Sequence, residues 1–258
     1  MIIELFRRLK LLYKKRRVRN DAKRLGLENY SNVEELFSDY FHNKTWSGGK
    51  KETVSGSGST LKKTRLLRQE LPKLLARYEV KSIFDAPCGD FNWFQHVERG
   101  SIRYIGGDIV KGLVVENSRK YSDHNTDFMH FDILNDEAPE ADVWICREVL
   151  LHLSNSLIFE FLRNFSKNRI HYLLVTTHYK FPENFDIPTG AGRPVNLEIA
   201  PFNLPKPIDY VEDEIGGGRP MRMGLWERET IVRQLGDPGR VRLSSTAAYG
   251  REEEYFTL

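Results

Sequence analysis

Short apolar runs alternate with amphipathic stretches along the middle of the chain. The runs are rich in β-branched and aromatic residues and are typical of buried strands, whereas the stretches between them have helical spacing. Strands that alternate with helices in this way build a parallel, right-handed, doubly wound sheet. The expected strands are 82–86, 104–109, 127–131, 141–146 and 170–177, and the expected helices between them are 92–98, 111–121 and 154–166.

The alternation stops after the fifth strand, and a stretch rich in proline and glycine follows over residues 179–223. A loop of this length inside a compact domain is usually functional, so we expect it to shape an acceptor site. A helix over 227–235 and two strands, 240–245 and 253–257, should follow, and the two strands are close enough to pair antiparallel. The sequence therefore predicts an α/β fold with a seven-stranded, mostly parallel, Rossmann-like sheet whose last strand is antiparallel.

The part of the chain before the sheet has a different character. Helices are expected over 1–20 and 32–41, and a Gly/Ser-rich loop follows from Trp46 to Thr60. We expect this loop to join two parts, a helical N-terminal extension (1–58) and a single α/β domain (59–258). A Gly/Ser run directly before a helix could also fold over a ligand, and this alternative stays open. The length of the chain does not require a further domain.

Charge is distributed unevenly along the chain. Residues 1–20 contain eight basic residues and one acidic residue, so they contribute +7, and the other 238 residues sum to −4. Apolar residues lie among these basic residues at helical spacing and predict a basic amphipathic helix. Two interpretations stay open: peripheral contact with an anionic membrane surface, or a packed helix with a solvated charged face. The acidic remainder argues against nucleic acid as a partner.

The cysteine content indicates the cellular compartment. The chain has two cysteines, Cys88 and Cys146, which are far apart and lie in or beside apolar runs. A disulfide framework is therefore not expected, and a reducing cytoplasm fits. No stretch approaches the ~20 apolar residues of a membrane span. We expect a cytoplasmic protein, with attachment of residues 1–20 to the inner face of the membrane as the open alternative.

Acidic side chains stand at the ends of the first three expected strands, where an open parallel sheet binds its ligand. Asp85 precedes a tight turn in which Gly89 lets backbone N–H groups approach a ligand. Asp108 follows Asp85 by 23 positions, a spacing at which an acid accepts the hydroxyls of a ribose. Asp132 is placed to accept the amino group of adenine. Each could alone be a turn or cap residue, but together they predict a site for adenosine with a charged tail.

The glycine content of the turn after the first strand argues against a dinucleotide. The dinucleotide fingerprint has three glycines, whereas Pro87 and Phe91 stand at the positions that flank Gly89. A nicotinamide-dependent dehydrogenase is therefore the weaker interpretation.

Four strings in this order resemble the motifs of class I S-adenosylmethionine-dependent methyltransferases: Phe-Asp-Ala-Pro-Cys-Gly-Asp, Gly-Gly-Asp, His-Phe-Asp-Ile and Val-Trp-Ile-Cys-Arg-Glu-Val-Leu-Leu-His-Leu. The resemblance covers about residues 57–258 and implies S-adenosylmethionine as the cofactor. The Gly/Ser loop, the string Asp-Ala-Pro-Cys-Gly-Asp-Phe-Asn-Trp and the late proline-rich run are similar to bacterial methyltransferases of surface polysaccharides and glycans. The resemblance implies a cofactor site made of Asp85, Cys88, Gly89, Asp108, Ile109, Asp132, Ile133, Arg147 and Leu151.

Methyl transfer to a hydroxyl requires a base that removes the proton of the acceptor. His152 is the first candidate, because an ordinary imidazole pKa of about 6.5 suits this task near neutrality. Glu148 lies four positions earlier and would share a helical face with it, although a surface pair would have the same spacing. His178, after the fifth strand, is the second candidate base. No spaced cluster resembles a metal motif, and we assign no metal.

The predicted function is an S-adenosylmethionine-dependent methyltransferase that acts on a hydroxyl of a small or saccharide acceptor. One alternative is an RNA or protein methyltransferase that uses the basic tail as an electrostatic handle. The Asn/Asp-Pro-Pro-Tyr type of motif that positions an amino group is absent, however, and Cys-Arg-Glu-Val stands in its place. A second alternative is a non-catalytic nucleoside-binding protein. The oligomeric state is not predicted.

Overall fold

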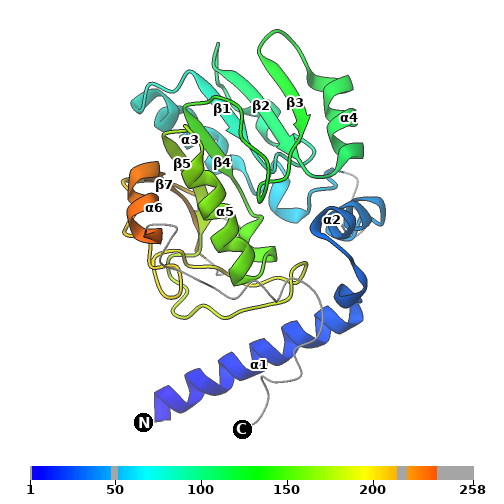
Figure 1. Cartoon of the computed structure of the whole chain (residues 1–258), viewed down its shortest axis with the longest axis vertical. Helices are drawn as coiled ribbons and strands as arrows, with labels where there is room; N and C mark the ends of the chain where they lie inside the picture. Colours follow the sequence, from blue (N-terminus) through cyan, green and yellow to red (C-terminus); the bar gives the residue numbers. More distant parts are fainter. Residues whose placement is uncertain (1, 48–51, 214–219, 237–258) are drawn as a thin grey trace.

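A seven-stranded sheet forms the centre of the molecule (Figure 1). The computed structural model describes residues 2–47, 52–213 and 220–236. The strand order is β3-β2-β1-β4-β5-β7-β6, and β7 runs antiparallel to both of its neighbours. The predicted fold class is therefore confirmed. The strands are β1 (Ser82–Asp85), β2 (Arg103–Asp108), β3 (Thr126–His130), β4 (Val143–Cys146), β5 (Tyr172–Thr177), β6 (Asp209–Glu212) and β7 (Arg222–Glu227).

Helices cover both faces of the sheet because its central strands are apolar on both sides. One face packs against α3 (Arg65–Arg77), whose buried leucines include Leu71. The other packs against α5 (Asn155–Lys167), which begins where the Ser154 hydroxyl accepts the backbone N–H of Leu157. Trp144 of β4 contacts Phe161 of α5, with their ring centroids 5.5 Å apart. The two other helices of the domain are α4 (Lys111–Tyr121) and α6 (Arg228–Leu235).

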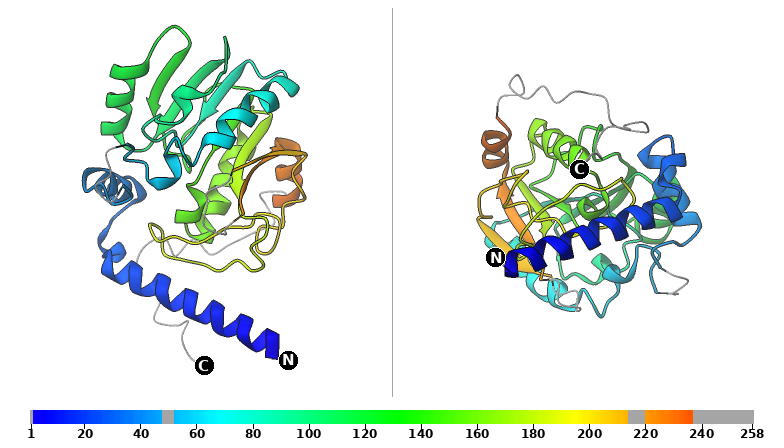
Figure 2. Two further views of the ribbon diagram at one scale, coloured as in Figure 1. Left: turned by 180° about the vertical axis from the view of Figure 1, so that it is seen from behind. Right: turned by 90° about the horizontal axis from the view of Figure 1, so that it is seen from below.

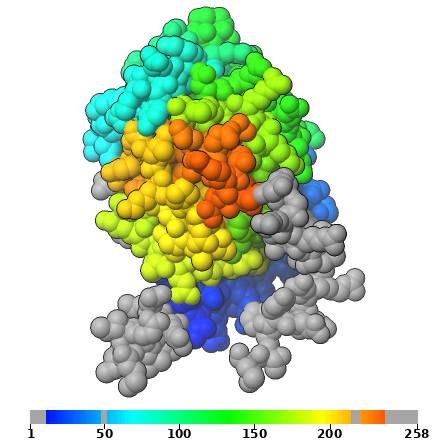
Figure 3. Space-filling model, turned by 60° about the vertical axis from the view of Figure 1, so that its left-hand side comes forward, coloured from blue at the N-terminus to red at the C-terminus, as the bar shows by residue number. Residues whose placement is uncertain are grey.

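The C-terminal strands differ from the prediction. The segment 179–223, expected to lack regular structure, contains β6 and the start of β7. The expected strands 240–245 and 253–257 lie outside the described residues. Gly224 weakens the strand signal of β7, because glycine is uncommon in strands. The structure requires glycine at this position, since a Cβ atom there would lie 2.5 Å from the Trp226 ring. Figure 3 shows the insert (yellow) and α6 (orange) side by side on one face of the molecule.

The expected helix over 92–98 is wrong. Only a single 3₁₀ turn forms there, η3 (Phe94–His96). Val97 is already extended, with φ −86° and ψ 124°, so the turn cannot continue as a helix through 98. The turn instead buries Phe91 and Phe94 against Tyr104 of β2, with ring centroids 4.9 and 4.6 Å away.

The N-terminal part contains two helices and packs onto the same core as the sheet. Helix α1 (Ile2–Arg24) runs across one end of the molecule (Figures 1 and 2). A 3₁₀ turn, η1 (Leu27–Asn29), leads to α2 (Val33–His42), which begins where the Asn32 side chain accepts the backbone N–H of Glu35. Among the described residues, no helix is long and apolar enough to cross a membrane.

Candidate active site

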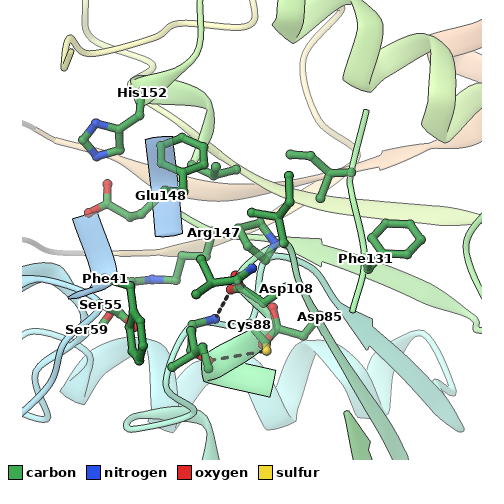
Figure 4. A pocket seen from close by; sticks show the side chains of 18 of the residues that line it. Phe41, Ser55, Ser59, Asp85, Cys88, Asp108, Phe131, Arg147, Glu148 and His152 are labelled. Atoms are coloured by element: carbon green, nitrogen blue, oxygen red, sulfur yellow. Dashed lines mark hydrogen bonds between the residues drawn. The ribbon is translucent and has the colours of Figure 1, made fainter. Parts of the chain in front are cut away.

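A pocket opens at the carboxyl ends of the parallel strands β1 to β4 (Figure 4). Its floor comes from the strand ends and the turns that follow them, as the sequence predicts for an open α/β sheet. Leu151 and His178 do not belong to the lining. The other predicted site residues all line it: Asp85, Cys88, Gly89, Asp108, Ile109, Asp132, Ile133, Arg147, Glu148 and His152.

Asp85 is a buried carboxyl at the end of β1, with 2% of its surface exposed. The Tyr104 hydroxyl donates a hydrogen bond of 2.9 Å to it. Burial raises the pKa of Asp85 to about 7, although the Tyr104 bond and the charge of Arg147 act in the opposite direction. A carboxyl of this kind is well suited to a cationic ligand, which would favour its ionised form.

Asp108 connects the turn after β1 to the end of β2. One carboxylate oxygen accepts the backbone N–H of Gly89 at 3.0 Å, and the other accepts that of Val110 at 3.0 Å. Burial raises the pKa of Asp108 to about 6 despite these two bonds. Each carboxylate oxygen can accept a second hydrogen bond, so Asp108 can hold the turn and still accept from a ligand hydroxyl. Cys88 lies between the two acids, and burial raises the pKa of its thiol well above the ordinary value.

Gly89 is required both by its conformation and by its surroundings. Its φ is 59°, and a Cβ atom there would lie 2.5 Å from the Ser55 hydroxyl. The Ser55 side chain cannot easily move away, because its hydroxyl donates a hydrogen bond of 3.0 Å to the Asp90 carboxylate and accepts one of 2.8 Å from the Asp90 backbone N–H. The Gly/Ser loop is thereby pinned to the turn after β1.

We expect Gly89→Ala to destabilise the protein more than Gly100→Ala does. Gly100 has nearly the same φ, 56°, but nothing lies within 4 Å of a Cβ atom there. Gly100→Ala should cost about 1–2 kcal/mol from backbone strain alone, and Gly89→Ala about 1–3 kcal/mol more from the clash with Ser55. Urea unfolding of both variants measures the difference. Equal losses would contradict the tight packing of Ser55 on the turn.

Asp132 lines the pocket and also stabilises a turn. One of its carboxylate oxygens accepts the backbone N–H of Leu134 at 2.9 Å, and the other accepts from the Asn135 side chain at 2.7 Å. The site interpretation and the turn interpretation of this residue are therefore compatible. Whether Asp132 reads an adenine amino group stays a prediction.

Arg147 joins three segments of the chain at the edge of the pocket. Its guanidinium forms a two-pronged ion pair with Asp213, with N···O distances of 2.7 and 3.1 Å. It also donates to the carbonyl of Gly58 at 3.1 Å and lies 5.3 Å from the centre of the Trp93 ring. Burial alone would lower the pKa of Arg147, but Asp213 with the neighbouring acids raises it. Arg147 thus carries a permanent positive charge and acts as a fixed part of the pocket wall.

His152 is held in one tautomer by the insert after β5. Its Nδ1 lies 2.8 Å from the carbonyl oxygen of Ala191, and a carbonyl can only accept, so the proton resides on Nδ1. The Trp46 ring lies 5.2 Å from the imidazole. Burial lowers the pKa of His152 to about 4. The expectation of an ordinary pKa for His152 is therefore wrong, because burial opposes the charged form. At neutral pH the ring is uncharged, and Nε2 carries the lone pair.

Glu148 reaches the pocket from a strained backbone position. Its φ is 58°, in the left-handed region that non-glycine residues rarely adopt, and its N–H donates to the Thr176 hydroxyl at 3.0 Å. Strain of this kind is often found at functional sites. Figure 4 shows the Glu148 carboxylate and the His152 ring close together on one side of the pocket, away from Asp85 and Cys88.

His178 and Leu151 have structural surroundings instead. His178 is buried, and its Nδ1 accepts the backbone N–H of Val195 at 3.1 Å, which anchors the insert to the end of β5. The Leu151 carbonyl accepts the backbone N–H of Arg193 at 3.0 Å. Within the described part of the chain, no group of three or more His, Cys, Asp or Glu residues is placed to hold a metal ion.

The sequence did not predict that α2 contributes to the pocket, and it left open whether the Gly/Ser loop folds over a ligand. A roof covers the strand ends, and it consists of α2 with the Gly/Ser loop. Helix α2 is held there by the burial of Leu36, Phe37 and Tyr40 in the core, and Glu34 forms an exposed ion pair with Lys111 of α4 at 2.8 Å. The sequence predicted a helix over 32–41 but not the surface on which it packs. The roof residues that line the pocket are Val33, Phe37, Phe41, Trp46, Val54, Ser55 and Ser59.

Comparisons with known proteins find similarity in structure but not in sequence. No protein-family profile and no curated protein sequence matches the chain. A crystal structure of magnesium protoporphyrin IX methyltransferase (ChlM) from Synechocystis PCC 6803 with bound SAH is similar, with a TM-score of 0.55 and 14% identity over 76% of this chain and 99% of that one. PigF with SAH is similar with a TM-score of 0.55 and 13% identity, over 81% of this chain and 67% of that one. At such low identity, these similarities show that the chain has the fold of these methyltransferases.

Proposed function

We propose that this protein transfers a methyl group from S-adenosylmethionine to a hydroxyl of a small or saccharide acceptor. The observation that carries the proposal is the pair of buried carboxyls, Asp85 and Asp108, at the ends of adjacent parallel strands in one pocket. Burial opposes the charge of both groups, and a ligand with a ribose and a cationic tail would satisfy both. The structures of ChlM and PigF, each with SAH bound, support the same ligand class.

The residues of the pocket fit this cofactor along its length. Asp108 would accept the ribose hydroxyls, and Asp85 would face the cationic methionine end. Ile109, Phe131 and Ile133 supply apolar surface for the adenine. When bound, the cofactor supplies a methyl group on a positively charged sulfur, which an acceptor oxygen can attack directly.

The residues on the other side of the pocket suit a hydroxyl acceptor. His152 presents a neutral Nε2 that can accept the hydrogen bond of the acceptor hydroxyl. As the bond to carbon forms, Nε2 takes the proton of the hydroxyl, and the Glu148 carboxylate, which lies beside the ring (Figure 4), favours the resulting imidazolium. Trp46 and Trp93 add aromatic surface against which the apolar face of a sugar ring can pack. These residues support a glycan-type acceptor, in agreement with the sequence resemblance.

Calorimetry tests the cofactor. We expect S-adenosylhomocysteine to bind the full chain and NAD not to bind, because the turn after β1 lacks the glycines of a dinucleotide site. Binding of NAD without S-adenosylhomocysteine would overturn the proposal.

Mass spectrometry of candidate glycans incubated with isotopically labelled cofactor tests the reaction. Once an acceptor is found, His152→Ala should lower turnover about 100-fold or more while cofactor affinity stays within about twofold. His124, which is exposed and lies outside the pocket, gives a matched control, and His124→Ala should leave turnover unchanged. Full turnover in His152→Ala would place the base elsewhere. Cofactor binding without methylation of any acceptor would favour the nucleoside-binding alternative.

A further inference from the structure

Helix α1 carries apolar residues on two opposite sides. On one side, Leu11, Val18 and Ala22 pack against the core of the domain, and Ala22 is only 5% exposed. Tyr13, on the opposite side, is 70% exposed, and Leu12, on the flank between the two sides, is 61% exposed. A single exposed apolar residue, such as Val115 at 67%, is ordinary on a protein surface, but Leu12 and Tyr13 are adjacent in the sequence and basic residues lie around them.

The helical repeat explains why one helix has two apolar sides. An α-helix has about 3.6 residues per turn, so positions nine apart lie two and a half turns apart, on opposite sides. Tyr13 lies nine positions before Ala22. Leu12 precedes Tyr13 by one position, about 100° around the helix, and therefore lies on the flank between the two sides. The exposed residues Leu12 and Tyr13 are therefore separate from the apolar stripe that packs on the domain.

Basic residues surround the exposed side. Arg16, Arg17, Lys23 and Arg24 lie three, four, ten and eleven positions after Tyr13, spacings that return to the same side of the helix, and all four are exposed. Asp21, which lies near Arg17 and Arg24 at 3.9 and 3.3 Å, is the only acidic residue in the part of α1 whose side chains the structure describes. We call this surface, Leu12, Tyr13, Arg16, Arg17, Lys23 and Arg24, the outer face of α1.

The helix is held on the body of the protein while its outer face points away. The Lys14 ammonium lies 4.9 Å from the centre of the Phe181 ring in the insert. Figure 2 shows α1 running across one end of the molecule, with the insert against one side of it. Any flat surface bound by the outer face would therefore lie along this end of the protein.

We propose that the outer face of α1 binds an anionic lipid bilayer, with the helix parallel to the membrane plane. Leucine and tyrosine side chains bury favourably at the boundary of headgroups and acyl chains. Each nearby arginine or lysine contributes about a fivefold factor in affinity for an anionic surface, from about 1 kcal/mol of attraction. Nucleic acid would use the charges but would leave Leu12 exposed to water. The inference does not depend on the reaction that the pocket catalyses.

Vesicle co-sedimentation of the full chain tests this inference. We expect binding to vesicles of phosphatidylcholine with phosphatidylglycerol, little binding to phosphatidylcholine alone, and weaker binding at high salt. Arg16→Glu with Arg17→Glu should weaken binding at least about tenfold. Leu12→Ser with Tyr13→Ser removes the apolar contact without changing charge and should also weaken binding at least about tenfold.

The matched control makes the same change in net charge as Arg16→Glu with Arg17→Glu, but at positions outside α1. Lys62 and Lys206 are exposed and lie outside α1, and Lys62→Glu with Lys206→Glu should change vesicle binding less than about twofold. All variants replace exposed side chains, so unchanged melting temperatures would verify that they fold. Equal binding to neutral and anionic vesicles, or an equal loss in the control, would overturn the inference. Binding of duplex RNA without binding of vesicles would assign the face to nucleic acid instead.

Discussion

Replacing Asp213 with alanine is expected to lower the free energy of unfolding by about 3–5 kcal/mol, because a buried charge loses its partner. The Arg147 side chain is 4% exposed, and that of Asp213 is fully buried, at 0%. The Gly58 carbonyl and the Trp93 ring would remain near the guanidinium, but neither carries a negative charge. Urea unfolding followed by tryptophan fluorescence measures the loss.

An exposed ion pair provides the control. Lys73 and Glu70 on α3 are 2.8 Å apart, and their side chains are 64% and 40% exposed, so Glu70→Ala should cost at most about 1 kcal/mol. Arg147→Met combined with Asp213→Leu should recover much of the stability lost in Asp213→Ala, since it removes both charges. A cost in Asp213→Ala no larger than that in Glu70→Ala would show that this pair is not a buried anchor.

Affinity for S-adenosylmethionine is expected to rise about tenfold or more between pH 5.5 and pH 7.5. Asp85 and Asp108 have pKa values of about 7 and about 6 in the free protein, so both are largely protonated at pH 5.5. A cationic ligand binds the ionised carboxylates and displaces their protons. Calorimetry over this pH range, in buffers of different ionisation enthalpy, measures both the affinity and the number of protons released.

Asp85 and Asp108 make the stability of the free protein depend on pH in the opposite direction. Their pKa values lie above the ordinary value of about 3.9 for an unfolded chain, so the folded state binds more protons between about pH 4 and pH 7. The stability of the free protein should therefore fall as pH rises through this range, whereas stabilisation by the cofactor should grow.

Variants of the two acids separate their contributions. Asp85→Asn should release fewer protons on binding, and Asp108→Ala should weaken binding more than tenfold because the ribose hydroxyls lose a charged acceptor. Affinity that does not change between pH 5.5 and pH 7.5 would contradict the proposed position of the cationic end.

The floor of the pocket could be predicted from the sequence, because local pattern determines where strands end. Asp85 and Asp108 occupy the last positions of β1 and β2, and parallel strands bring such positions to one edge of a sheet. Periodicity and turn residues near each position contain this information. The two residues were therefore placed in one site without knowledge of any distant contact.

The roof and the anchors of the pocket could not be predicted, because they rest on contacts between distant residues. Arg147 and Asp213 are 66 positions apart, and Ser55 and Asp90 are 35 apart. The pattern of α2 shows that one face is buried but does not identify the surface it covers. His178 was a reasonable candidate by position, but the backbone of the insert, at Val195, occupies its Nδ1.

The roof also bears on the order in which the site is made during synthesis. Residues 33–59 leave the ribosome before any strand of the sheet, so the apolar residues of α2 have no surface to cover at that time. The anchor of Arg147 requires Asp213, which is synthesised still later. The pocket is therefore completed only when the segment up to Asp213 has emerged, and until the sheet forms Phe37 and Trp46 lack the surface that they cover in the folded protein.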